Sequence, residues 1–225
     1  MNYNYMEKVS STNTFVKERI AELPDWYVLR AGEQTDGRGR FDRVWHCENG
    51  KDIAMSVLIP VSIDVLPNLT AIVGVSVMQV LERYVRADIK WPNDILIRNR
   101  KVCGILCEAI TFNSTVKVVV GIGLNVNSKR EKPAISLSDE ARRKFNLDIL
   151  AKDIVKRIIR NINRNDFKRE LNRKLAYRNE IKTVIDGDKR ITGTVIGIGE
   201  NCELLMKGED GIMKFISGEI SFEKT

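Results

Sequence analysis

Histidine and cysteine are scarce in this chain of 225 residues, and their scarcity limits its chemistry. His46 is the single histidine, and the four cysteines lack the spacing of zinc ligands. We therefore expect no metal site built from nitrogen and sulfur, and reduced, buried thiols instead. Cys47 follows His46 directly, but neighbouring side chains of an extended segment point in opposite directions. This argues against a thiol nucleophile with an adjacent base.

Long apolar runs and a leader-like N-terminus are also missing. No uninterrupted apolar segment approaches the ~20 residues that a membrane helix needs. The first eight residues lack the basic-then-apolar order of a signal peptide. We therefore expect a cytoplasmic protein without a membrane partner. The composition, 43% hydrophobic and 30% charged, is typical of a globular protein with room for one domain and a small appendage.

Acidic residues are outnumbered, and the formal net charge is +7. The excess lies in residues 129–190, which hold 19 basic and 10 acidic side chains. A nucleic-acid-binding module would interleave aromatic residues with the basic ones, but this stretch holds only Phe145, Phe167 and Tyr177. We interpret it as the solvated face of helices, and steering of an acidic partner protein is the second interpretation.

Hydrophobic periodicity predicts helices mixed with strands up to residue 180. Helices are expected from a start signal at residues 10–13 to Pro24, over 66–84, and over 148–176 with a break near 163–165. Strands are expected at 3–9, 26–31, 53–60, 88–91, 95–97, 102–110 and 116–126. The later strands have hairpin spacing, which predicts an antiparallel or mixed sheet. Beyond residue 180, short β segments with glycine turns predict a small barrel.

The loop Gly37-Arg38-Gly39-Arg40, with Arg43 close behind, is the most distinctive segment. Glycine lets the backbone approach a ligand closely. Each guanidinium presents a rigid fork of donors that fits a carboxylate or a phosphate. A solvated turn or a nucleic-acid contact loop would also tolerate arginine. The alternation with glycine favours a loop that closes over an anionic small molecule.

A second segment, residues 90–94, reads Lys-Trp-Pro-Asn-Asp, and Lys101 and Gly104 follow it. Proline fixes an extended conformation for the preceding tryptophan, and Asn-Asp is turn chemistry, so a hairpin alone explains the pattern. A lysine, an indole and an acid around a rigid turn also suit a site for an activated phosphate. Gly104 would permit close approach of a substrate to the strand.

Two weaker signals complete the set. Ser11-Thr12-Asn13 is an ordinary helix cap. Residues 121–127, Gly-Ile-Gly-Leu-Asn-Val-Asn, follow a β-branched strand but fall short of a dinucleotide fingerprint. The carboxamide of Asn125 could both donate to and accept from a purine edge.

Together, these segments resemble the biotin protein ligase family. The residues that carry the resemblance are Gln34, Gly37-Arg38-Gly39-Arg40-x-x-Arg43-x-Trp45, Lys90-Trp91-Pro92-Asn93-Asp94, Lys101, Gly104 and Gly121-x-Gly-x-Asn125. Their order and spacing match across residues 11–127, and the C-terminal segment is similar too.

The resemblance implies an α+β fold in two parts. Residues 1–179 would form the catalytic domain, a mixed β-sheet flanked by helices as in class II aminoacyl-tRNA synthetases. Residues 180–225 would form a small SH3-like β-barrel. The implied reaction joins biotin and ATP into biotinyl-5′-AMP and then transfers biotin to a lysine of a biotin carboxyl carrier protein domain. Mg²⁺ would accompany the ATP phosphates without a metal site of the protein's own.

The resemblance also implies roles for individual residues. Those expected to bind biotin are Ser11, Thr12, Asn13, Gln34, Gly37, Arg38, Gly39, Arg40, Lys101 and Gly104. Those expected to bind ATP or the adenylate are Arg40, Arg43, Trp45, Asn93, Lys101, Gly123 and Asn125. Those expected to act in catalysis are Arg38, Arg40, Lys90, Asp94 and Lys101. Asp94 would either orient and deprotonate the incoming amine or serve only as a turn residue.

The chain departs from the family at two points. Asp42 stands where family members often carry glycine, so the local loop geometry is open. The catalytic motifs begin at Ser11, which leaves no room for an N-terminal helix-turn-helix, and we expect no DNA partner. A homodimer could form if residues 116–126 supplied a free strand edge. The alternative activity is that of a lipoate or acyl protein ligase with the same fold.

Overall fold

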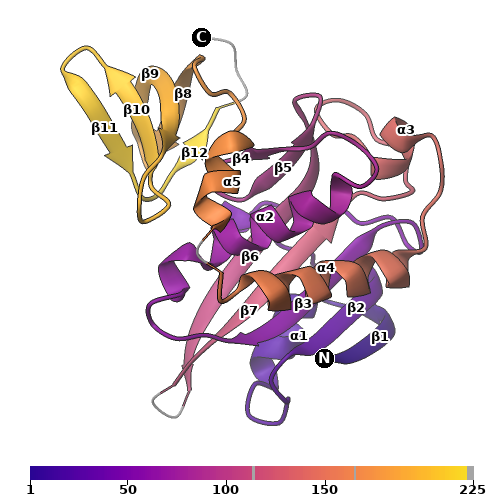
Figure 1. Cartoon of the computed structure of the whole chain (residues 1–225). Helices are drawn as coiled ribbons and strands as arrows, with labels where there is room; N and C mark the ends of the chain where they lie inside the picture. Colours follow the sequence, from indigo (N-terminus) through magenta and orange to yellow (C-terminus); the bar gives the residue numbers. More distant parts are fainter. Residues whose placement is uncertain (113–114, 165, 222–225) are drawn as a thin grey trace.

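The computed structural model describes residues 1–112, 115–164 and 166–221, which fold into two sheets with flanking helices (Figure 1). The larger sheet has seven strands in the order β1-β2-β3-β7-β6-β5-β4. Its strands are β1 (Asn2–Val9), β2 (Tyr27–Gln34), β3 (Ile53–Pro60), β4 (Asp88–Lys90), β5 (Asp94–Ile97), β6 (Arg100–Phe112) and β7 (Thr115–Leu124). β1 runs parallel to β2 and every other neighbouring pair is antiparallel, so the sheet is mixed.

Both faces of the sheet are covered because successive side chains of a strand point to opposite sides. On one face, Val118 and Val120 of β7 join the main core with helices α2 (Leu69–Leu81) and α4 (Leu147–Asn161). On the other face, Val119 packs in a smaller core beneath helix α1 (Thr12–Glu18). Helix α1 therefore lies on the opposite side of the sheet from α2 and α4.

The smaller sheet follows helix α5 (Phe167–Arg173) and stands apart from the large one in Figure 1. Its order is β11-β10-β9-β8-β12, all antiparallel. The strands are β8 (Ile181–Asp186), β9 (Lys189–Ile198), β10 (Leu204–Gly208), β11 (Gly211–Phe215) and β12 (Glu219–Ile220). Among the described residues β11 does not pair with β12, so the predicted barrel is an open, five-stranded sheet.

The smaller sheet is tied to the rest of the fold by specific hydrogen bonds. The indole Nε1 of Trp91 donates to the carbonyl of Cys202 at 3.0 Å. The carboxamide of Asn172 on α5 spans Ile198, accepting from its N–H at 2.8 Å and donating to its carbonyl at 3.1 Å. These bonds hold the smaller sheet against α5 and the segment 90–94.

Most predicted elements are confirmed, with three differences. β7 is paired on both sides, with β3 and β6, so residues 116–126 offer no free edge and that route to a homodimer is wrong. The α-helix expected over 66–84 is shorter, because α2 covers Leu69–Leu81, and it is buried almost all round by the sheet, α4 and α5. The short helix α3 (Leu137–Ala141) was not predicted.

Other bounds agree closely with the sequence. The expected break in the helix over 148–176 separates α4 from α5, and its residue 165 lies outside the described residues. Two single-turn helices are also present: Arg40–Asp42 lies within the arginine loop, and Leu66–Asn68 directly precedes α2. Within the described ranges, no helix is both long and apolar enough to cross a membrane.

Candidate active site

A cavity of about 330 Å³ opens on the α1 face of the large sheet. Residues 119, 121 and 123 of β7 point to this face. Val119 fills its position in the smaller core, whereas Gly121 and Gly123 leave space for the floor of the cavity. A Cβ on Gly121 would lie 2.5 Å from Oδ1 of Asn13, and a Cβ on Gly123 would overlap the indole of Trp45. The two glycines stand about 7 Å apart along the strand. The cavity therefore has two ends, one under Asn13 and one under Trp45.

The end under Asn13 is lined by hydrogen-bonding side chains from the start of α1. Ser11 caps the helix by accepting from the N–H of Thr14. Oε1 of Gln34 accepts from the N–H of Thr12 at 2.8 Å and from its hydroxyl at 3.0 Å. The hydroxyl of Ser56, fully buried below, lies 2.5 Å from Oδ1 of Asn13. This end is a connected polar floor.

The other end is cationic. Nζ of Lys101 lies 2.7 Å from Oδ1 of Asp94 and 5.6 Å from the centre of the Trp45 ring. The missing side chain of Gly104 makes room for both, since a Cβ there would be 3.1 Å from the indole. The cations that line the whole cavity are Arg38, Arg40, Arg43, Lys101 and Arg130. Two carboxylates, Asp94 and Glu219, oppose these five cations, so the cavity suits an anionic ligand.

The arginine loop is closed at its base by a hydrogen bond from the Trp45 N–H to the Gly37 carbonyl at 2.8 Å. At its tip, Phe41 and Asp42 both have left-handed backbones, with φ of 56° and 55°. This conformation favours glycine, which gives a physical reason for the family's preference at position 42. Arg38 pairs with Asp36 at 2.7 Å and remains exposed.

The smaller sheet contributes a carboxylate to the site. Glu219 on β12 pairs with Arg43 at 2.7 Å and lies 3.8 Å from Nζ of Lys90. Burial opposes ionisation of Glu219, but the hydrogen bond from Arg43 and the nearby lysine charges bring its pKa below the usual value. Arg40 donates to the carbonyl of Gly218 at 3.2 Å. The loop is thus bound to the C-terminal sheet.

Lys90 is predicted to make stability depend on pH. Burial lowers its pKa to about 8, against 10.5 for an ordinary lysine. Between these values the unfolded chain still binds the proton that the folded protein has released. The free energy of unfolding should therefore rise with pH across this range, by up to about 3 kcal/mol. Lys90→Met should lack this rise. Chemical denaturation from pH 7 to 10.5 measures it, and parallel curves for the two proteins would contradict it.

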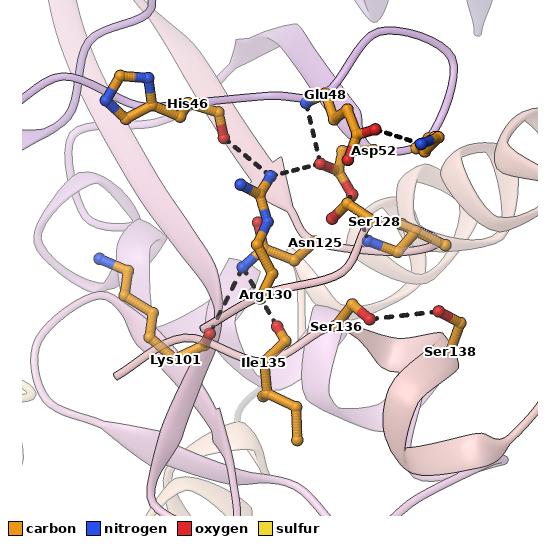
Figure 2. A network of polar contacts seen from close by, with 12 residues as sticks. His46, Glu48, Asp52, Lys101, Asn125, Ser128, Arg130, Ile135, Ser136 and Ser138 are labelled. Atoms are coloured by element: carbon orange, nitrogen blue, oxygen red, sulfur yellow. Dashed lines mark hydrogen bonds and ion pairs between the residues drawn. The ribbon is translucent and has the colours of Figure 1, made fainter. Parts of the chain in front are cut away.

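A buried carboxylate anchors the two segments that border the cationic end (Figure 2). Oδ1 of Asp52 accepts from the Val126 N–H at 2.8 Å and the Ser128 hydroxyl at 2.7 Å. Its Oδ2 accepts from the Glu48 N–H at 3.0 Å and pairs with Arg130. Asp52 therefore holds the chain before β3 against the chain after β7.

Asn125 is largely committed to the fold. Its Nδ2 donates to the carbonyl of Ile135 at 3.2 Å and lies 3.5 Å from that of Lys101 (Figure 2). Asn93 is similar, because its Nδ2 donates to the Ile105 carbonyl at 2.8 Å and its Oδ1 accepts from Arg40 at 3.2 Å. These carboxamides hold the cavity walls, so much of their hydrogen-bonding capacity is already committed to the protein.

The structure brings together nearly all residues expected from the sequence. Those that line the cavity are Ser11, Thr12, Asn13, Gln34, Arg38, Gly39, Arg40, Arg43, Trp45, Asn93, Asp94, Lys101, Gly104, Gly123 and Asn125. Gly37 and Lys90 lie behind the wall. Gly37 is needed for loop closure, since a Cβ there would be 2.5 Å from the Trp45 carbonyl. Lys90 is buried below Asp94 and Glu219.

Sequence reasoning missed several residues of the site. Arg130 was assigned to the solvated basic stretch, and nothing in the segment distinguished it. Glu219 belongs to a different sheet and reaches the cavity only through the fold. Ser56 sits in an otherwise apolar strand, where a lone serine was the available signal. Within the described ranges, no three histidine, cysteine, aspartate or glutamate side chains gather to hold a metal ion.

Comparison with known proteins places the chain in a class of ligases. Residues 5–125, more than half of the chain, match the biotin/lipoate A/B protein ligase family. Residues 182–223 match the biotin protein ligase C terminal domain. The chain therefore belongs to the biotin/lipoate A/B protein ligase family.

Individual relatives agree with this assignment. The bifunctional ligase/repressor BirA of Bacillus spizizenii is 38% identical over 143 residues, which cover 61% of this chain and 44% of that protein. The biotin–[acetyl-CoA-carboxylase] ligase of Mycobacterium tuberculosis is 30% identical over 168 residues, 69% of this chain and 60% of that protein. The chain thus spans less than half the length of the Bacillus relative.

A solved structure matches almost end to end. It is described as biotin protein ligase from Aquifex aeolicus in complex with biotin and ATP, and it has a TM-score of 0.86 at 29% identity. The match covers 98% of this chain and 97% of that one. The predicted fold, a mixed sheet flanked by helices with a small C-terminal β domain, is confirmed.

Proposed function

We propose that this protein is an ATP-dependent biotin protein ligase. It would form biotinyl-5′-AMP and pyrophosphate from biotin and ATP, then transfer biotin to a lysine of a biotin carboxyl carrier protein domain and release AMP. Residues 1–179 would carry the chemistry, with residues 180–225 as the C-terminal domain. The names of the relatives and the biotin and ATP bound to the Aquifex protein support this proposal.

The observation that carries the choice of biotin is the polar floor. The Thr12 hydroxyl donates to Gln34, and the single proton of Ser56 faces two acceptors, Oγ1 of Thr12 and Oδ1 of Asn13. The floor therefore has more acceptors than protons. The cyclic urea of biotin supplies N–H groups, whereas the dithiolane of lipoate has none. Each buried acceptor left unsatisfied costs about 1–3 kcal/mol, which disfavours the lipoate or acyl ligase alternative.

Direct binding tests this choice. Titration calorimetry with biotin, lipoate and octanoate should give tight binding for biotin and at least about 100-fold weaker binding for the other two acids. Equal or tighter binding of lipoate would favour the lipoate or acyl protein ligase activity and would not affect the description of the fold.

In the first half-reaction two anions must approach each other. A carboxylate and a phosphate charge ~4 Å apart repel by about 4 kcal/mol at an effective dielectric of 20. Arg38, Arg40, Arg43 and Lys101 would offset this repulsion and stabilise the charge that develops on the phosphorus oxygens. ATP would enter as its magnesium complex, with the metal held by phosphate and water oxygens.

The end under Trp45 would hold the nucleotide. The indole of Trp45 occupies the space beside Gly123, and its buried Nε1 has no hydrogen-bond partner among the described residues. The indole would cover the adenine, and Oδ1 of Asn125 would accept from its amino group. Lys101 would bind the biotin carboxylate and the phosphate, at the point where the two ends of the cavity meet.

In the second half-reaction the acceptor lysine must lose a proton before it can attack the mixed anhydride. Asp94 would be released as a proton acceptor when Lys101 turns from it to the phosphate. If Lys101 stays on Asp94, the carboxylate only holds the turn. Lys90, with its pKa lowered to about 8 by burial, would adjust the charge beneath this carboxylate.

The exposed Arg38 is predicted to retain the adenylate. Its guanidinium is exposed and hydrogen-bonds to Asp36 two residues away, so it can turn inward over the ligand. Arg38→Ala should release adenylate prematurely and weaken its binding by about 10-fold, the effect of one lost charge-assisted hydrogen bond. Trapping released biotinyl-5′-AMP from pre-loaded enzyme measures this. Unchanged retention would count against a covering role for the loop.

The proposed partner is a biotin carboxyl carrier protein domain, which carries the acceptor lysine. Names such as biotin–[acetyl-CoA-carboxylase] ligase support a carboxylase carrier. We propose no DNA partner for the described residues.

A further inference from the structure

Glu108 makes a contact that the proposed reaction does not use. Residues 104, 106 and 108 of β6 all point to the α1 face of the sheet. Gly104 and Leu106 line the main cavity, and Glu108 is the next residue on that face. Its Oε2 accepts from Nδ2 of Asn13 at 2.7 Å, and its Oε1 pairs with Lys17 at 2.5 Å. Asn13 and Lys17 are one helical turn apart, so both reach the same carboxylate.

This contact fixes the orientation of the Asn13 amide. A carboxylate can only accept hydrogen bonds, so the group that faces Glu108 must be the amide nitrogen. The amide oxygen must then face the cavity floor, where it lies close to Ser56 and above Gly121. Without the carboxylate, the amide could rotate and present its nitrogen to the floor instead.

The orientation of this amide decides the hydrogen-bonding character of the floor. With the oxygen inward, Oδ1 of Asn13 and Oγ1 of Thr12 share the one proton of Ser56. A ligand N–H would supply the second donor that these two acceptors need. With the nitrogen inward, the floor would gain donors and lose its need for a ligand N–H. The ligand preference of the floor therefore depends on Glu108, a residue that is not part of the floor.

We propose that Glu108 is a positioning residue that determines the specificity of the site for a ligand carrying ring N–H groups. This inference rests on the proposed function. Glu108 itself faces a second cavity of about 560 Å³, which Lys17 also lines, and it acts on the ligand only through Asn13. Lys17 pairs with the other carboxylate oxygen of Glu108, so the oxygen on Asn13 is left in place.

The test compares biotin with its cyclic carbamate analogue, in which oxygen replaces one ureido N–H. Calorimetry on the full chain should show that the wild type prefers biotin by about 10- to 100-fold, because an acceptor of the floor is left unpaired by the analogue. Glu108→Gln keeps the size of the side chain but lets the Asn13 amide turn. We expect biotin to bind about 10-fold more weakly and the preference to fall to a few-fold.

Two further variants separate positioning from general damage. Lys17→Met removes the ion pair but leaves the carboxylate on Asn13, and it should keep the preference for biotin. Asn13→Asp combined with Glu108→Gln exchanges donor and acceptor across the contact and keeps an inward-facing oxygen, so the preference should return. An equal loss of affinity for both ligands in Glu108→Gln, or an unchanged preference, would overturn the proposal. A wild type that binds no biotin would overturn the proposed function instead.

Discussion

We expect Lys101→Met to lower the rate of biotin-dependent adenylate formation by about 100- to 1,000-fold. The ammonium of Lys101 stands between the polar floor and the end of the cavity under Trp45, 2.7 Å from Asp94. In the proposed reaction it would meet both the biotin carboxylate and the α-phosphate. Removing it withdraws stabilisation from the transition state in a partly enclosed site, where a fixed charge has its largest effect.

Lys129→Met is the matched control. It removes the same charge from an exposed position outside the lining of the cavity. Pyrophosphate exchange at saturating biotin and ATP should be close to that of the wild type in this variant. A similar loss in both variants would mean that net charge, and not the position of Lys101, governs the reaction. A loss below about 10-fold in Lys101→Met would contradict its assigned role.

The second large effect is expected from a single methyl group. In Gly123→Ala the new Cβ would overlap the indole of Trp45, and Gly123 lies on an inner strand that pairs with both β3 and β6. The strand cannot move, so the indole must leave its position. We expect adenylate affinity to fall by about 100-fold, since small misplacements in a site have effects of this size.

Gly104→Ala provides the graded comparison. Its Cβ would lie 3.1 Å from the same indole and 3.2 Å from Cε of Lys101, contacts that a shift of a few tenths of an ångström relieves. The expected loss is only a few-fold. Adenylate titration monitored by tryptophan fluorescence measures both variants. A larger effect from Gly104→Ala than from Gly123→Ala would show that Trp45 does not occupy the position described.

The fold could be predicted from local patterns wherever those patterns report burial. β3 was predicted with its observed bounds because Ile53–Pro60 is apolar apart from Ser56, as expected for a strand covered on both faces. The same pattern cannot say which strand lies at an edge. β7 was considered as an edge, yet it is central, because strand order depends on contacts between distant segments.

The site could be predicted where its residues are grouped in the sequence. The arginine loop, the segment 90–94 and the glycines of β7 form recognisable groups, and the fold brings them together. Arg130 and Glu219 were not predicted as site residues because an isolated charge in the sequence resembles an ordinary surface residue. Glu108 escaped for the same reason, although its contact with Asn13 joins residues that are 95 positions apart.

Residue type also does not reveal which hydrogen bonds the fold has already used. Asn125 was expected to donate to a purine and accept from it. Its amide nitrogen faces the carbonyls of Ile135 and Lys101, which leaves the amide oxygen for a ligand. Asp94 was considered as a base or as a turn residue. The structure shows in addition that its carboxylate forms an ion pair with Lys101. Both outcomes depend on long-range packing.

Biotin-dependent exchange of labelled pyrophosphate into ATP tests the central claim most directly. Lipoate and octanoate serve as parallel acids in the same assay. The proposed function predicts exchange with biotin and none above background with the other two, because adenylate formation is reversible and requires the acid that fits the polar floor. Exchange with lipoate in place of biotin, or no exchange with any acid from folded protein, would contradict it.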